Sequence, residues 1–195
     1  MSMEHKAFLF DTKGFNKELS SIILESGGKE DPEPLKKYIE KNFYWLRLST
    51  NEKKMIKEKL DDNDIQLLAD IALTAFYSPE EDLGLSYSWD ALLEAFEKLP
   101  LQFTPEYYLL GKPLKNETFK LDPGAMGMGF VDEKDIIEIC RELQKLRESL
   151  INNGLPESKD LLYEITLEEL IEAYDELVEL YQLAGRNKRG LMFTF

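Results

Sequence analysis

Histidine and cysteine are almost absent from this chain of 195 residues, which contains one of each, His5 and Cys140. A single cysteine excludes an internal disulfide framework. The two residues together cannot supply the several Cys or His ligands of a zinc site. Any histidine-based acid–base catalysis would have to use His5, close to the first residue. We therefore expect no catalytic residue, no bound metal and no cofactor.

Long apolar runs are missing too. No run approaches the ~20 residues that would span a bilayer. The opening MSMEHKAFLFD has only a short apolar patch before an acid, unlike a signal peptide. The composition is that of a folded protein, with 43% hydrophobic and 11% aromatic residues. We therefore expect a cytoplasmic protein, and its length fits a single domain over residues 1–195.

Positive charge is scarce in one part of the chain. The formal net charge is −14; residues 1–60 hold 12 Lys/Arg against 10 Asp/Glu, whereas residues 61–195 hold 12 against 28. We therefore distinguish a helical N-terminal extension, 1–60, from an acidic core region, 61–195. Nucleic acid and anionic membranes would repel such a chain, so we expect neither as a partner. The charge serves either solubility or the docking of a basic protein.

Hydrophobic periodicity predicts helices along most of the chain. Gly27 and Gly28 are expected to end the first helix. Asp132 is expected to cap a long helix, and Thr166 with Glu169 three residues later forms a capping-box pattern at the start of the last one. Further helices are expected at residues 34–43, 51–60, 65–76, 89–99 and 105–110.

The two ends of the sequence differ from the rest. KAFLF, residues 6–10, and GLMFTF, residues 190–195, are short, aromatic and apolar, which is typical of strands. A lone buried strand leaves its backbone polar groups unsatisfied, so we expect the two to pair or to join one sheet. The predicted fold class is α+β, predominantly helical: a single compact domain with a small sheet containing the N- and C-terminal strands.

LDPGAMGMGFVDEKDI, residues 121–136, places Gly124, Gly127 and Gly129 before a predicted helix. Glycines in front of a helix N-terminus can cradle a phosphate, but neither the dinucleotide nor the Walker order of glycines is present. Acidic residues already fill the first turn of the helix and oppose a second anion there. We interpret the stretch as a loop that packs closely on its neighbours, with a ligand site as the alternative.

GLSYSWD, residues 84–90, gathers aromatic and acidic residues. Tyr87, Trp89 and Asp90 could form a small-molecule site for a sugar or a cation together with the glycines of residues 123–130. A tryptophan at a helix start is also typical of a core anchor. The small-molecule site, in an enzyme or a sensor, is therefore the alternative hypothesis for function.

The last helix carries acids on its outer face without one basic residue. Like charges four residues apart cost a few tenths of a kcal/mol per pair, and a merely solvated face would more often mix signs. Neutralisation could come from Arg186, Lys188 and Arg189, or from a partner. The candidate partner-binding residues are Glu168, Glu172, Asp175, Glu176 and Glu179.

Four segments follow one another in residues 86–195: SWDALLEAFEKLP, YYLLGKP, a glycine-containing stretch before a long helix, and AYDELVELYQLAGRNKRGLMFTF. This order resembles the YfbM-like family of uncharacterised bacterial proteins, although AMGMGF departs from the Gly-Pro form of that family. The resemblance implies a compact α+β fold. Because the function of the family is unknown, it implies no activity and no catalytic residue.

The sequence therefore favours a non-catalytic protein-interaction module whose acidic half binds a basic partner. An enzyme is less favoured, and a homodimer stays open.

Overall fold

A computed structural model describes residues 3–157 and 161–195, and three short antiparallel strands form its centre. Met192 of the middle strand lies opposite Phe8 on one side and Phe130 on the other. The pairing of the first and last strands confirms the predicted α+β fold; the third strand was not predicted. In order across the sheet, the strands are β1 (Lys6–Phe10), β3 (Gly190–Thr194) and β2 (Met128–Val131).

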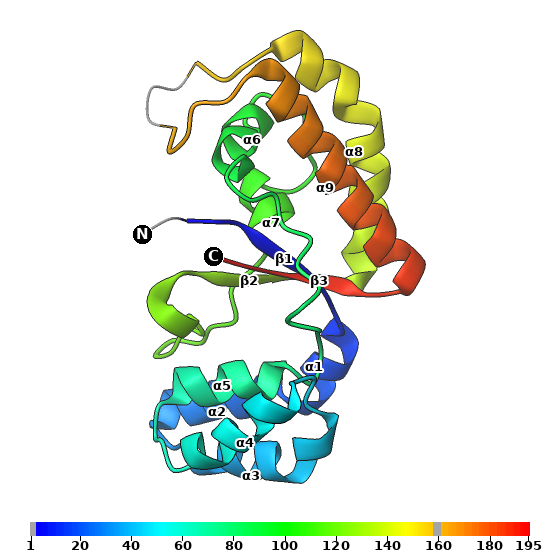
Figure 1. Ribbon diagram of the computed structural model, residues 1–195. Helices are drawn as coiled ribbons and strands as arrows, with labels where there is room; N and C mark the ends of the chain where they lie inside the picture. Colours follow the sequence, from blue (N-terminus) through cyan, green and yellow to red (C-terminus); the bar gives the residue numbers. More distant parts are fainter. Residues whose placement is uncertain (1–2, 158–160) are drawn as a thin grey trace.

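The sheet separates two layers of helices, which Figure 1 shows above and below the strands. Successive side chains of a strand point to opposite faces, so the strands supply both hydrophobic clusters. Phe8, Phe10 and Met192 belong to the lower cluster, whereas Leu191 and Phe193 belong to the upper one. The two cores of this helix–sheet–helix structure therefore share the same strands.

The lower layer is formed by the helices that follow β1. Ser49 and Glu52 form a reciprocal capping box at one helix start, and the Asp64 carboxylate accepts backbone N–H bonds at another. Ile39 and Leu68 lie in one cluster, so residues before and after position 60 share a core. The elements of this layer are α1 (Thr12–Glu18), α2 (Ser20–Lys29), α3 (Glu33–Asn42), the 3-10 turn η1 (Phe43–Trp45), α4 (Thr50–Lys59) and α5 (Ile65–Leu73).

One helix end differs from its prediction. Helix α2 continues through Gly27 and Gly28, and Glu30, with φ 54°, is its left-handed C-cap. A Cβ atom on Gly27 would lie 2.2 Å from the ring of Phe119. The glycine is therefore needed because a ring packs on it, and the prediction that it ends the helix is wrong.

The upper layer contains the two longest helices, which run side by side in opposite directions (Figure 1). The predicted capping box of Thr166 and Glu169 is confirmed. The Tyr181 hydroxyl donates to the Tyr108 carbonyl oxygen at 2.9 Å and ties the last helix to a short one. In the part of the chain that the structure describes, every helix is too short or too polar to cross a membrane. The elements are α6 (Trp89–Phe96), α7 (Pro105–Leu109), α8 (Glu133–Asn153) and α9 (Leu167–Asn187).

Candidate functional site

The three glycines of residues 121–136 serve the backbone in different ways. Gly124 and Gly127 have φ of +67° and +88°, and Gly124 lies in the 3-10 turn η2 (Pro123–Ala125). The Gly127 N–H donates to the Asp122 carboxylate, so it is already occupied. A Cβ on Gly129 would lie 2.0 Å from the Leu110 carbonyl oxygen. Gly129 thus lets β2 lie against the preceding loop, as close packing requires.

Residues 84–90 are held mostly by internal contacts. Trp89 is only 7% exposed, and its indole N–H donates to the Met3 carbonyl oxygen at 2.9 Å. The buried Asp90 carboxylate accepts the backbone N–H groups of Ala91 and Leu162. Trp89 and Asp90 therefore hold the start of α6, and their polar groups are satisfied within the chain.

The two segments of the alternative small-molecule site meet at one aromatic ring. The rings of Trp89 and Phe195 lie 4.8 Å apart in an edge-on contact. A Cβ on Gly127 would lie 3.5 Å from the same Phe195 ring. Tyr87 remains 39% exposed, with its ring 4.9 Å from that of Tyr163. Because Phe195 fills the space between the segments, a ligand there would have to displace a packed side chain.

The acidic face of α9 contains one carboxylate that the protein neutralises itself. Arg147 of α8 donates two hydrogen bonds of 2.7 Å to Asp175, and this contact lowers the pKa of Asp175. Arg189, a predicted counter-charge for this face, pairs instead with Asp11 at 2.6 Å. Arg186 donates to Gln182. Arg189 is thus paired elsewhere in the fold, whereas Arg186 borders the same hollow as Glu176 and Glu179.

The remaining acids of α9 lie close enough to influence one another. Partial burial, together with the charges of Glu172 and Glu179, raises the pKa of Glu176. In the described ranges, ion pairs include Asp175 but none of these three glutamates. This part of α9 keeps its negative charge at a cost in electrostatic energy.

These acids border two hollows that meet at Glu176 and Glu179. A hollow of about 440 Å³ lies along the acidic face, and another of about 530 Å³ lies between α9 and the loop at Leu83. Apolar side chains of both elements form part of the walls. We call the combined surface the α9 groove; it is lined by Leu83, Gly84, Glu168, Ile171, Glu172, Asp175, Glu176, Glu179, Leu180, Gln182, Leu183 and Arg186.

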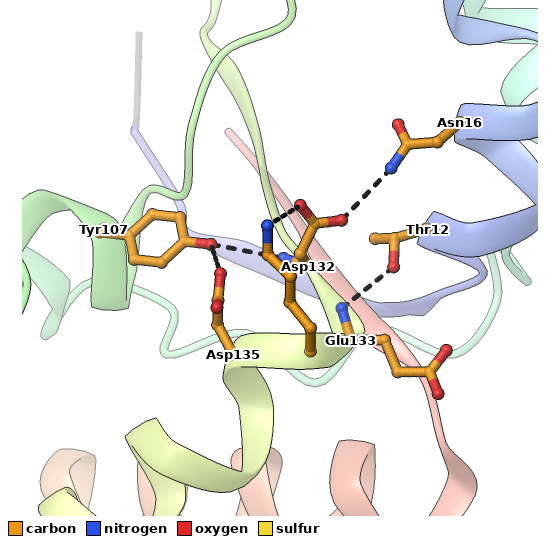
Figure 2. A network of polar contacts seen from close by, with 7 residues as sticks. Thr12, Asn16, Tyr107, Asp132, Glu133 and Asp135 are labelled. Atoms are coloured by element: carbon orange, nitrogen blue, oxygen red, sulfur yellow. Dashed lines mark hydrogen bonds and ion pairs between the residues drawn. The ribbon is translucent and has the colours of Figure 1, made fainter.

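A further hollow of about 710 Å³ lies where α7 meets the start of α8. Figure 2 shows the polar network at its edge. The Tyr107 hydroxyl donates to Asp135 at 2.8 Å, and burial and this bond raise the pKa of Tyr107. The Asp132 carboxylate accepts from Asn16 at 3.3 Å and lies 3.6 Å from the Lys134 ammonium group. These carboxylates are thus engaged within the protein.

The same network joins the two helical layers. The Glu133 N–H at the start of α8 donates to the Thr12 hydroxyl of α1 at 3.1 Å (Figure 2). Asp132, predicted as the cap of α8, occupies the N-cap position but makes no capping bond with its side chain. Its carboxylate reaches Asn16 of α1 instead, which no pattern of nearby residues could have indicated. We interpret the network as a structural link between the layers.

Reactive chemistry is weakly represented in the described residues. Burial raises the pKa of the Cys140 thiol, which disfavours the nucleophilic thiolate. Across residues 3–157 and 161–195, no three His, Cys, Asp or Glu side chains converge to hold a metal ion. In the α9 groove, by contrast, burial and neighbouring glutamates raise the pKa of Glu176.

Comparisons of the chain with family models, curated proteins and solved structures found no match. The resemblance to YfbM-like proteins stays a prediction.

Proposed function

We propose that this protein is a non-catalytic interaction module whose α9 groove binds a basic partner. The observation that carries the proposal is a run of glutamates beside apolar walls, with none of them in an ion pair among the described side chains. A partner segment with Lys or Arg next to an apolar side chain would satisfy both parts of the groove.

The energetics of α9 support this proposal. Glu172 and Glu176 are four residues apart on a helix, and such like-charge pairs cost a few tenths of a kcal/mol. The fold relieves this cost at Asp175, where Arg147 supplies a two-bond contact. At Glu172, Glu176 and Glu179 the cost remains, so a cationic partner would lower the energy of the bound state.

The proposal also includes location and partner class. The net charge of −14 and the single cysteine suit a cytoplasmic protein that docks another protein and avoids nucleic acid and anionic membranes. The resemblance to YfbM-like proteins is compatible with this role, since it implies no reaction.

A designed helical peptide of about 18 residues, with Lys and Arg on one face and Leu on the other, tests the groove. Fluorescence anisotropy of the labelled peptide should show binding near 50 mM salt that weakens at least about tenfold near 500 mM, because salt screens the charges. Glu176→Gln should weaken binding and raise the free energy of unfolding by about 0.2–0.5 kcal/mol, since a like-charge contact is lost.

Glu148→Gln is the matched control, because Glu148 is an exposed glutamate of α8 outside the groove. It should leave peptide binding unchanged. Equal losses in the two variants would show non-specific attraction to a negative protein and would contradict the proposal, as would unchanged binding by Glu176→Gln.

A further inference from the structure

Two neighbouring aromatic side chains project from the lower layer into solvent. Tyr44 is 89% exposed and Trp45 is 77% exposed, both in the η1 turn, and Met55 of α4 is 57% exposed. The other tryptophan of the chain, Trp89, is buried. Tryptophan, tyrosine and methionine are enriched in protein–protein interfaces, and tryptophan is a frequent energetic hot spot there.

The segment that contains these aromatic residues is basic. Residues 36–59 hold eight Lys/Arg against three Asp/Glu, a net charge of +5 in a protein of −14. The Lys53 ammonium group donates to the Tyr44 carbonyl oxygen at 3.5 Å, and that of Lys57 lies 5.5 Å from the centre of the Phe43 ring. We call Tyr44, Trp45, Lys53 and Lys57 the knob.

The chemistry of the knob defines its counterpart. A projecting tryptophan needs a hollow with apolar walls, and the lysines of the knob need carboxylates at the rim. The α9 groove has both, with Leu180 and Leu183 in its wall and Glu176 and Glu179 at its edge. The hollow between α7 and the start of α8 also has apolar and acidic walls, but its Asp132 and Asp135 accept hydrogen bonds from Asn16 and Tyr107 within the fold.

We infer that the knob of one molecule docks into the α9 groove of a second copy. This inference rests on the proposed function and gives the basic partner an identity. The knob residues belong to η1 and α4, and the groove is lined by α9 and the loop at Leu83. Figure 1 shows α4 and α9 on opposite sides of the sheet. A knob therefore contacts the groove of another molecule.

Such a contact is head-to-tail, because it joins two different surfaces. Each added molecule leaves one knob and one groove free, so the product is a growing chain or a closed ring. The net charge of −14 opposes association, but the repulsion extends only about 8 Å at physiological salt, whereas the docked surfaces have opposite charges. Salt should therefore weaken assembly.

Sedimentation velocity of the full chain between about 1 and 200 µM tests the inference. The weight-average mass should rise with concentration near 50 mM salt and fall towards the monomer near 500 mM. Trp45→Ala and Glu176→Lys should each weaken association at least about tenfold, the effect of losing a hot spot. Acrylamide quenching, which reports mainly the exposed Trp45, should decrease on assembly.

Matched controls separate these effects from general changes in the surface. Ile137→Ala removes a side chain of α8 that is 55% exposed, and Glu148→Lys makes the same charge change as Glu176→Lys outside the groove. Both should associate like the wild type. Circular dichroism of each variant verifies that it is folded.

Mixing the two defective variants gives the decisive result. Trp45→Ala keeps its groove and Glu176→Lys keeps its knob, so an equimolar mixture should form a 1:1 dimer that does not grow further. A mixture that stays monomeric, or a contact between two knobs that survives Glu176→Lys, overturns the inference.

The outcomes also separate this inference from the proposed function. If the wild type is monomeric at about 200 µM but binds the basic peptide through Glu176, the inference that the partner is a second copy is contradicted. The proposed function is then still supported. If Trp45 of such a monomer instead responds to poly-glutamate, single-stranded RNA or phosphatidylserine vesicles, the knob belongs to that partner. A wild type that is monomeric and also fails to bind the peptide overturns both the proposed function and the inference that rests on it.

Discussion

At the scale of single residues, His5 shows how far burial changes a titratable group. Its position in the sequence is close to the first residue, but His5 is only 1% exposed. The Leu85 N–H donates to Nδ1 at 3.2 Å, so the proton is on Nε2, which donates to the Leu109 carbonyl oxygen at 2.6 Å. Both ring nitrogens are thus satisfied in the neutral form. Burial lowers the pKa of His5 to about 4.

The stability of the protein should therefore fall between pH 6.5 and pH 4. The folded pKa lies below the unfolded value of 6.5, so the unfolded state binds the proton more tightly in this window. At pH 5 the penalty is roughly 2 kcal/mol. Urea unfolding at pH 7 and pH 5 should show a larger loss in the free energy of unfolding for the wild type than for His5→Gln. Both proteins contain the same carboxylates, so the difference between them isolates the effect of the histidine.

NMR gives an independent measurement, because the chain has only one histidine. The ring proton signal should titrate far below pH 6.5. A titration midpoint near pH 6.5 would contradict a buried ring with a hydrogen bond at each nitrogen.

At the scale of helices and strands, short-range signals were the reliable ones. Thr166 with Glu169 lies three residues apart, and the pattern identified a real helix start. The prediction that the glycine pair ends α2 failed because Gly27 serves a different purpose: Phe119, far away in sequence, packs on it. Strand β2 was missed because glycines weaken strand patterns, and the contact that needs Gly129 comes from Leu110.

The candidate site was predictable to a similar extent. The charge repeat of α9 can be read from neighbouring residues, so the sequence could indicate an acidic helix face. The salt bridge from Arg147 and the wall at Leu83 depend on the packing of distant segments. The exposure of Trp45 is likewise a result of tertiary packing, which residue spacing does not determine.

Two threonines at N-cap positions of the upper layer differ in a way that mutation should reveal. The Thr166 hydroxyl accepts from the Glu169 N–H at 3.2 Å, whereas Thr104, the N-cap of α7, makes no capping bond with its side chain. Thr166→Ala should therefore lower the free energy of unfolding by about 1 kcal/mol. Thr104→Ala should change it by less than about 0.5 kcal/mol. Equal effects in urea unfolding would contradict the assigned capping geometry.

At the scale of the whole molecule, the sheet couples the two layers. Strand β3 supplies Met192 to the lower cluster and Leu191 and Phe193 to the upper cluster. The link from Thr12 to Glu133 adds a second connection. Losing one core would therefore expose one face of the strands that the other core needs.

Unfolding should consequently be a single transition. In a Trp45→Phe variant, fluorescence comes from Trp89 alone and reports on the upper layer, whereas far-UV circular dichroism reports on all helices, so the two midpoints should coincide. Leu68→Ala, a fully buried change in the lower layer, should cost about 2–5 kcal/mol and shift both signals equally. A Trp89 transition that does not move would show that the layers unfold separately.

The place of β3 also has a consequence for biosynthesis. The middle strand is translated after both of its neighbours, about 180 residues after β1. At roughly 5–20 residues per second, β1 waits about 10–40 s on the ribosome for its hydrogen-bonding partner. During that interval the nascent chain displays aromatic strand segments with open edges, so newly made molecules should depend on chaperones that shield such edges until translation reaches Gly190.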